Sequence, residues 1–524
     1  MRSRFQKVKR FFPLLILLCA LFTGAAGASK PNIVIIVADD MGWNDVGYHG
    51  SEIKTPTIDT LANEGVELDR FYAHPTCSPT RSALMTGQSP IRLGIMGPLS
   101  KNNPTGLPLS LTTMPQYFKN AGYQTALVGK WHLGRYKKDY WPQNRGFDHF
   151  YGYLTGGIGH YNHVHGGSLD WQRNGEPLRE KGYSTHLLTD ESVRLIKNRD
   201  KNNPLFMVIS YAAPHMPNEA PEETVAQYQN LKNEFRRLHA AMVTELDLGI
   251  KKIISVLENE AMMDNTIVWF MSDNGGMNFN ASTKTLQNLA TYLPKILGTP
   301  LPIKFLEFGR TNIMESAADN YPLKRGKKSV MEGGIRVPSF IYAPKLLKQH
   351  KVDYRITAED VLPTLITAAG LAPVKNQVVD GVEVWNLLTK KSTPKAKAFI
   401  THCPEAGAYL KGNWKLVISF SGELQLYDII KDPIENNNVA VSNQGVVNAL
   451  KAEYDAFPRG EIVNIPVWKV FLDPDFFGGE EDRAPMAGFE GHNAAPTSPA
   501  GYIALLVFFV VCLLIWYRKR TRIK

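Results

Sequence analysis

The chain has 524 residues and a formal net charge of +10 at pH 7. Five of its positive charges lie within residues 1–28 and five within 518–524, so the residues between carry no net formal charge. That balance excludes nucleic acid as a partner, since nucleic-acid-binding proteins need a basic surface. Four cysteines are too few for a disulfide framework, so a large core must stabilise the body.

The two ends of the chain have the composition of targeting and membrane segments. Residues 1–28 are basic, then apolar, and close on Ala26-Gly27-Ala28, which predicts a signal peptide. Residues 476–499 are rich in Gly, Ala and Pro and predict a stalk. The uncharged range 500–517 predicts a transmembrane helix, and the basic range 518–524 predicts a cytoplasmic tail. We therefore expect a single-pass type I membrane protein whose body is extracytoplasmic: periplasmic, luminal or extracellular.

The sequence between these segments shows two patterns of predicted secondary structure. Short, nearly continuous apolar runs alternate with helical patterns up to about residue 385, at 32–38, 124–128, 205–211, 266–272 and 337–342. Such runs are typical of strands covered on both faces, so we expect an α/β fold with a large, mostly parallel sheet between helices over 29–390. Helical patterns at 55–65 and 228–260 fit the same layer arrangement. Short strands at 398–402, 414–420 and 423–427 predict a small antiparallel-sheet domain over 391–475.

Cys77 lies in the run Pro-Thr-Cys-Ser-Pro-Thr-Arg-Ser-Ala-Leu-Met-Thr-Gly, residues 75–87. Pro79 suits the first turn of a helix and Gly87 its end, which predicts a helix over 79–86. Cys77 would then lie at the positive end of that helix, where an anion is favoured. Arg81, one turn further on, would add a fork of donors. The alternative is a buried structural cysteine.

Reactive residues follow four of the predicted strands. They are Asp39 and Asp40, then Lys130 and His132, then His215, and finally Asp273 and Asn274. Ligand sites in open α/β sheets lie beyond the carboxyl ends of the strands, so we expect these side chains to meet at one edge. The acids and the amide offer only oxygen, which favours a hard cation such as Ca²⁺ over zinc. Taken singly, an Asp pair after a strand is often a helix cap, and Asp-Asn-Gly-Gly is often a turn.

Three segments of the chain resemble motifs of one known family. The run around Cys77 resembles the signature of the type I sulfatases, in which an enzyme oxidises this cysteine to Cα-formylglycine. Residues 122–132 resemble the second sulfatase signature, and residues 426–435 resemble the C-terminal sulfatase pattern. Within the family the chain looks closest to arylsulfatases of the N-acetylgalactosamine-4-sulfatase type. The resemblance implies an alkaline-phosphatase-like sandwich with a smaller C-terminal domain.

The resemblance also implies a set of site residues. One Ca²⁺ would be held by Asp39, Asp40, Cys77, Asp273 and Asn274. The catalytic residues would be Cys77, Arg81, Lys130, His132, His215 and Lys327. Lys327 is included because it precedes Glu332 by the family's spacing, and Lys328 is a possible substitute.

The implied chemistry is sulfate ester hydrolysis through a covalent sulfo-enzyme intermediate. The formylglycine hydrate made from Cys77 would attack sulfur, while His215 protonates the departing oxygen. His132 would then take the proton of the remaining hydroxyl, so that sulfate leaves. Lys130, Lys327 and the calcium ion would neutralise the sulfate oxygens.

The expected substrate is a sulfated saccharide or an aryl sulfate, and the expected partner is a formylglycine-generating or equivalent maturation enzyme. Two alternatives remain: a phosphodiesterase or phosphonate hydrolase of the same superfamily, and a non-catalytic sulfated-glycan binder in which Cys77 is never oxidised. Residues 277–321 are expected beside the site, since both ends of that segment are. His160, His163 and His165 either line the substrate pocket or form a mobile polar loop.

Overall fold

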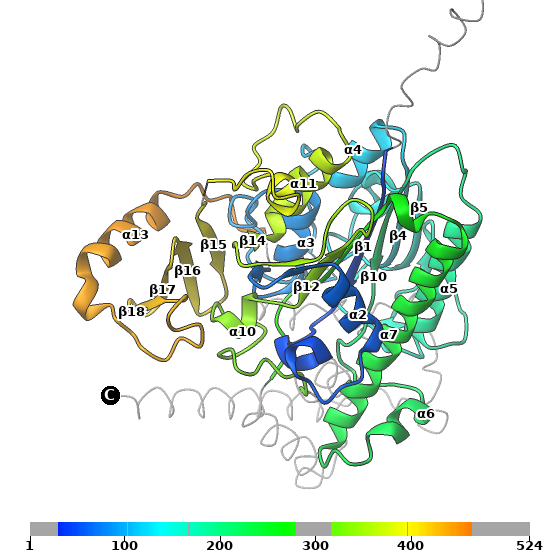
Figure 1. The fold of residues 1–524 in the computed structure, drawn as a ribbon, viewed down its shortest axis with the longest axis horizontal. Coiled ribbons are helices and arrows are strands. Elements are labelled where there is room, and N and C mark those ends of the chain that lie inside the picture. Colours follow the sequence, from blue (N-terminus) through cyan, green and yellow to red (C-terminus); the bar gives the residue numbers. More distant parts are fainter. Residues whose placement is uncertain (1–29, 102, 166–167, 279–315, 396, 464–524) are drawn as a thin grey trace, which may run out of the picture.

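The computed structural model describes residues 30–101, 103–165, 168–278, 316–395 and 397–463. Its centre is a ten-stranded sheet in the order β13-β2-β12-β11-β1-β10-β4-β5-β8-β9 (Figure 1). The strands, in chain order, are β1 (Asn32–Ala38), β2 (Val66–Leu68), β4 (Gln124–Lys130), β5 (His149–Tyr153), β8 (Gln172–Arg173), β9 (Glu176–Pro177), β10 (Leu205–Ser210), β11 (Thr266–Ser272), β12 (Ser339–Tyr342) and β13 (His350–Val352).

The sheet is mixed, and its parallel centre agrees with the mostly parallel sheet that the sequence predicted. Its five central strands, β11, β1, β10, β4 and β5, are parallel. Toward the edges β12 pairs antiparallel with β11 and β2, and β8 pairs antiparallel with β5 and β9. The predicted strand at 337–342 is real but runs against its neighbours, because an apolar run indicates burial and carries no information on direction.

Helices cover both faces of this sheet. Alternate residues of β1 point to opposite faces, so Ile33, Ile35 and Val37 enter one core, and Val34 and Ile36 enter the other. The first core is shared with α3 (Cys77–Thr86), α4 (Met114–Asn120) and α11 (Val361–Ala368). The second is shared with α2 (Pro56–Glu64), α5 (Ser184–Lys197) and α7 (Glu234–Asn259). The result is the α/β/α sandwich that the resemblance implied.

A second, antiparallel sheet follows the sandwich in the chain and lies beside it (Figure 1). Its strands are β15 (Phe399–His402), β16 (Ala406–Lys411), β17 (Trp414–Ser419) and β18 (Leu424–Asp428), in that order. The helix α13 (Gln444–Ala456) packs on it through Val447, Leu450 and Tyr454. The sequence predicted three of these strands and missed β16, whose residues Ala-Gly-Ala-Tyr-Leu-Lys lack the β-branched side chains typical of strands.

The predicted fold class is wrong in its C-terminal transmembrane helix. Within the described residues, no helix is both long and apolar enough to cross a membrane. The longest of them, α7, carries charged residues along its whole length, because only one of its faces is buried. The range assigned to the membrane helix, 500–517, lies outside the described residues. So do the predicted signal peptide, stalk and tail.

Candidate active site

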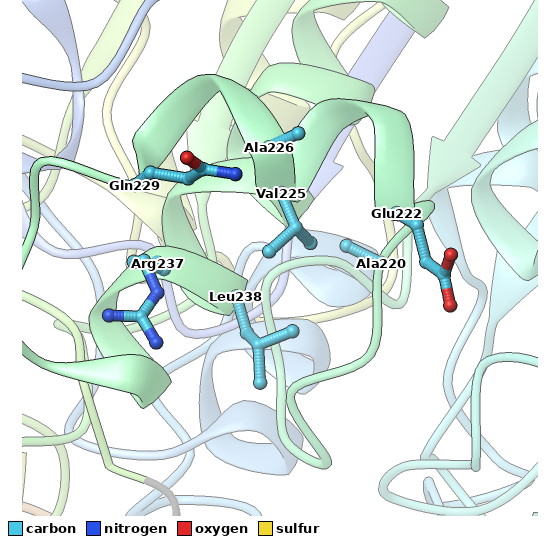
Figure 2. Close-up of a pocket in the computed structure, with 7 residues that line it drawn as sticks. All are labelled: Ala220, Glu222, Val225, Ala226, Gln229, Arg237 and Leu238. Carbon is cyan, nitrogen blue, oxygen red and sulfur yellow. The ribbon is translucent and has the colours of Figure 1, made fainter.

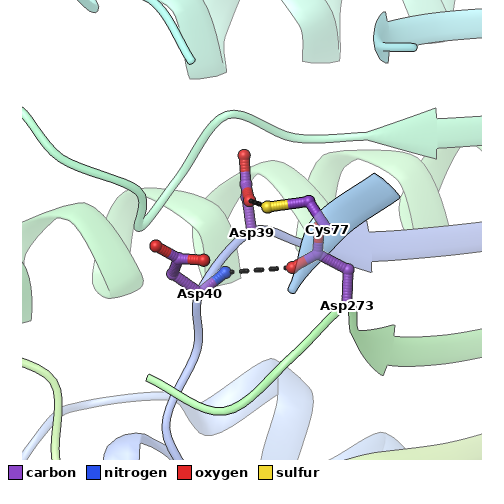
Figure 3. A group of neighbouring side chains, drawn as sticks. All are labelled: Asp39, Asp40, Cys77 and Asp273. Carbon is purple, nitrogen blue, oxygen red and sulfur yellow. Dashed lines mark hydrogen bonds between the residues drawn. The ribbon is translucent and has the colours of Figure 1, made fainter. Parts of the chain in front are cut away.

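The carboxyl ends of the central strands bring the predicted residues together. Asp39 and Asp40 follow β1, and Asp273 follows β11, its parallel neighbour. Figure 3 shows these three carboxylates and Cys77 converging on one point. Asp40 N donates to Asp273 Oδ1 at 3.3 Å, which ties the two strand ends together. Each of the four side chains is buried.

Cys77 is the first residue of α3, which begins two residues earlier than the sequence predicted. Its Sγ lies 3.7 Å from Asp39 Oδ1 (Figure 3). Burial and the charge of Asp273 raise the pKa of the Cys77 thiol to about 12. A buried thiol with a raised pKa is a poor nucleophile at neutral pH.

Arg81 braces the site from within α3. Its Nε and Nη2 donate to Asp273 Oδ2 at 3.0 and 2.8 Å. Its Nη1 donates to Ser210 Oγ at 2.6 Å and to the carbonyl oxygen of Lys130 at 3.1 Å. The guanidinium therefore joins the ends of three strands, and much of its donor capacity is used on the protein.

Two buried lysines face the carboxylates that follow β1. Lys130 Nζ lies 2.7 Å from Asp39 Oδ2, and Lys327 Nζ lies 2.6 Å from Asp40 Oδ1. Burial raises the pKa of Asp39 to about 7, although Lys130 opposes this. Burial also acts on Asp40, but Lys327 and His215 outweigh it and lower the pKa of that carboxyl well below its ordinary value. Lys327, the lysine that the sequence predicted for the site, thus reaches the carboxylate of Asp40.

The donor set fits a hard divalent cation. One ligand atom from each of Asp39, Asp40, Cys77 and Asp273 lies within 4.8 Å of the others. Asn274 Oδ1 is a buried acceptor that has no hydrogen-bond partner in the described part of the chain, while its Nδ2 donates to Asp40 Oδ1 at 2.7 Å. The bonds of Nδ2 to Asp40 Oδ1 and to the Gly275 carbonyl oxygen fix the amide in the orientation that leaves its oxygen for a metal. Carboxylate and amide oxygens are the ligands that Ca²⁺ prefers.

His132 has the protonation pattern of a base. Its Nε2 donates to the carbonyl oxygen of Leu99 at 3.0 Å, which fixes the proton on that nitrogen. Burial, with the charges of Lys130 and Arg81, lowers the pKa of His132 well below its ordinary value, so the ring is neutral. Its Nδ1 is buried and has no partner among the described residues. A neutral imidazole with one bare nitrogen can accept a proton.

His215 carries its fixed proton on the other ring nitrogen, Nδ1. Its Nδ1 donates to the carbonyl oxygen of Met216 at 2.6 Å, and its Nε2 lies 3.6 Å from Asp40 Oδ2. Burial lowers the pKa of His215 well below its ordinary value; Asp40 opposes this, and Lys327 reinforces it. The Nε2 atom therefore faces the site on the side of Asp40 and Lys327.

Two consecutive glycines that the sequence analysis passed over pack against the two histidines. A Cβ on Gly156 would lie 2.7 Å from His132 Cε1, and a Cβ on Gly157 would lie 2.8 Å from His215 Cε1. Real Cβ atoms do not approach so closely, so only glycine fits at both positions. The signal was the Gly-Gly pair just before the three histidines of the same loop.

Those three histidines support the loop. His160 is fully buried and bonds through Nε2 to the carbonyl oxygen of His215 at 2.9 Å. The buried His163 stacks on Trp171 with ring centroids 4.4 Å apart. His165 Nδ1 lies 2.5 Å from the carbonyl oxygen of Gly157. His160 thus holds the backbone of His215, a predicted catalytic residue.

Residues 279–315 lie outside the described residues, but the end of the predicted site segment is described. Asn320 exchanges two hydrogen bonds of 2.9 Å with Gly276, two residues beyond Asn274.

A separate hollow of about 540 Å³ lies on the surface between α6 (Glu222–Val225) and α7 (Figure 2). Its lining includes none of the predicted site residues.

Comparison with known proteins identifies the family. The sequence model of the sulfatase family matches residues 31–371. Arylsulfatase J of Mus musculus is 35% identical over 70% of this chain, although the match spans only 57% of that protein. N-acetylgalactosamine-6-sulfatase of Mus musculus is 31% identical over 72% of this chain and 70% of its own length. The crystal structure of Ps i-CgsB with k-i-k-neocarrahexaose superposes with a TM-score of 0.73 at 29% identity, covering 86% of this chain and 100% of that one. The chain belongs to the sulfatase family.

Proposed function

We infer that the protein is a sulfuric ester hydrolase. The observation that carries this inference is the buried centre in which Cys77, three carboxylates, two lysines and an arginine meet within one matched family domain. Such a centre offers a negatively charged ester several cations and leaves an unpartnered base, His132 Nδ1, within the described residues. These are the groups that displacement at sulfur requires.

Each of the chain's own site residues has a separate role. Lys130 and Lys327 hold the sulfate oxygens by charge, and Arg81 fixes Asp273 and the end of β4. His215 donates its Nε2 proton to the departing oxygen, a step that needs the imidazolium. A bound sulfate ester adds negative charge beside the ring and favours that form. His132 accepts a proton at Nδ1 in the step that frees sulfate.

Two further groups complete the centre. We propose that Asp39, Asp40, Asp273 and Asn274 hold one Ca²⁺, which would supply Lewis acidity and charge neutralisation when bound. We propose that a maturation enzyme converts Cys77 to Cα-formylglycine, whose hydrate supplies the nucleophilic oxygen. The match to the sulfatase family model, which includes Cys77, supports this conversion.

The proposed substrate class is a sulfated saccharide. Relatives of the chain include an N-acetylgalactosamine-6-sulfatase, and a similar structure carries a neocarrahexaose. We also propose that the body acts outside the cytoplasm, since residues 1–28 are typical of a signal peptide.

The test is a side-by-side assay of the purified protein on 4-nitrophenyl sulfate, 4-nitrophenyl phosphate, bis(4-nitrophenyl) phosphate and a panel of sulfated oligosaccharides. We expect kcat/KM to be highest for a sulfate ester. Mass analysis of the peptide that contains Cys77 should show the replacement of SH₂ by O. A preference for phosphate esters would overturn the proposal, and an unmodified Cys77 in inactive native protein would favour a binding protein.

A further inference from the structure

The small antiparallel sheet reaches the catalytic domain through one buried charged cluster. Lys415 of β17 is fully buried, and its Nζ lies 2.9 Å from Glu332 Oε1 and 2.7 Å from Glu435 Oε1. The hydroxyl of Tyr72 donates to Glu332 Oε2 at 2.7 Å. We call these four residues the Lys415 cluster. Its charges lie away from water, so each member depends on the others for compensation.

Glu435 holds both ends of the loop that carries Lys327. Its Oε2 accepts from the backbone N–H of Glu332 at 2.7 Å, and its backbone oxygen accepts from Lys324 Nζ at 2.8 Å. The loop is closed between these two points by Gly333 N, which donates to the carbonyl oxygen of Lys324 at 3.0 Å. One residue of the C-terminal region therefore fixes the beginning and the end of the loop.

The backbone of Glu435 supports a special role for this position. Its φ of 56° lies in the left-handed region, which a residue with a Cβ adopts only at a cost. Glu435 is also fully buried. Strain of this kind persists where surrounding contacts determine it, and here the contacts are those to Lys324, Glu332 and Lys415.

The middle of the same loop reaches the site. Lys327 N donates to the carbonyl oxygen of Gly276 at 3.0 Å, and Lys327 Nζ contacts both carboxylate oxygens of Asp40 at 2.6 and 2.7 Å. A shift at the loop ends would therefore move the ammonium group that faces the substrate.

We propose that Lys415 and Glu435 are positioning residues, through which the small sheet sets the place of Lys327 and with it the affinity of the site for a sulfate group. The inference deepens the proposed function and rests on its assignment of Lys327 to sulfate binding. By this proposal the small sheet contributes to sulfate binding at the site.

The experiment compares Lys415→Met and Glu435→Gln with the control Lys411→Met. Lys411 belongs to the same sheet and pairs with Glu453 at 2.6 Å, but both of these side chains are about half exposed. The readouts are competitive inhibition of 4-nitrophenyl sulfate hydrolysis by inorganic sulfate, and the rise in Tm that inorganic sulfate produces. We expect both cluster variants to lose about tenfold or more in sulfate affinity, because small displacements of a binding group are costly. The control should change it less than about twofold.

The background Lys327→Ala separates positioning from general damage. If the cluster acts through Lys327, then Lys415→Met should lower sulfate affinity by less than about twofold once Lys327 is gone, since coupled residues are not additive. An equal loss in both backgrounds would overturn the proposal. So would a folded Lys415→Met protein that binds sulfate as tightly as the wild type.

Tyr72→Phe covers the case in which Lys415→Met and Glu435→Gln fail to fold. It keeps the ring and removes only the hydrogen bond to Glu332, so the protein should fold and lose about threefold in sulfate affinity, again only when Lys327 is present. Unchanged affinity would overturn the proposal. If the wild type hydrolyses no sulfate ester, the proposed function fails separately, and the sulfate-induced change in Tm still tests the positioning role.

Discussion

Two buried carboxylate clusters lie close together in this protein and differ in how completely they are paired. Asp45 accepts from Arg236 Nη1 at 2.5 Å, from His239 Nε2 at 2.9 Å and from the backbone of Gly42 at 2.8 Å. Burial acts to raise the pKa of Asp45, but His239 and Arg236 lower it well below its ordinary value. The pKa of Asp39, in contrast, is raised to about 7 by burial despite a lysine 2.7 Å away.

The difference separates a structural cluster from a reactive one. The Asp45 cluster satisfies its carboxylate fully and so favours one arrangement of the loop after β1 and helix α7. The centre around Asp39 includes acceptors without partners among the described residues, Asn274 Oδ1 and His132 Nδ1. Buried polar atoms without partners are costly, so they are expected where a ligand completes the set.

The largest expected effect is the loss of turnover when the cysteine of the reactive centre is replaced. Cys77→Ala should lower kcat on 4-nitrophenyl sulfate by at least about a thousandfold, because it removes the residue from which the proposed nucleophile is made. Cys403→Ala is the matched control, since Cys403 is the other buried free cysteine of the described residues and lies beside β15. Its kcat should stay within about twofold of the wild type. Retained turnover in Cys77→Ala would remove the distinction between the two clusters.

The second prediction concerns the metal. Asp273→Asn should lower kcat/KM by at least about a hundredfold and abolish the rise in Tm that added Ca²⁺ produces in the chelator-treated protein. The reason is that it removes a proposed charged ligand of the metal and the partner of Arg81. Asp45→Asn should keep the response of Tm to Ca²⁺. Equal loss of the response in both variants would show that the clusters act as one.

The third prediction tests the packing of the reactive histidines. Gly157→Ala should displace His215 and lower kcat/KM by roughly 10- to 100-fold. The loss should be greater for an alkyl sulfate than for 4-nitrophenyl sulfate, because a poor leaving group depends more on protonation. Gly445→Ala is the control, since a Cβ at Gly445 meets no atom of the described residues within 4 Å. An equal loss on both substrates would indicate general damage and no effect on proton transfer.

The sequence predicted the strand ends well because their residue types are extreme. An apolar run that stops at Asp39 or Asp273 marks both a buried strand and its boundary, so the convergence of these residues followed from the parallel order of β1 and β11. Two other strands were less accessible to prediction: the direction of β12 depends on partners far away in the chain, and β16 has no β-branched side chains to mark it as a strand.

The residues that support the site were missed for a related reason. Nothing near Lys415 in the sequence indicates burial, since a lysine in a strand is usually solvated, and its partners Glu332 and Glu435 are distant. The Gly156-Gly157 pair was missed because its neighbours in space, His132 and His215, come from other segments. Local patterns encode chemistry and burial, whereas positioning depends on tertiary contacts.

The smallest effect on turnover is expected for the structural cluster itself. Asp45→Asn should lower the free energy of unfolding by roughly 3 kcal/mol at pH 7, because it leaves His239 and Arg236 without their buried partner. Since the folded pKa of Asp45 lies below the unfolded value, its stabilisation is present above about pH 4 and is lost as the pH falls further. The difference in unfolding free energy between wild type and variant, measured by urea denaturation, should therefore be larger at pH 6 than at pH 3. If the loss of unfolding free energy did not change with pH, Asp45 would stabilise the loop by hydrogen bonding alone. The two clusters would then differ in the role of charge as well as in pairing.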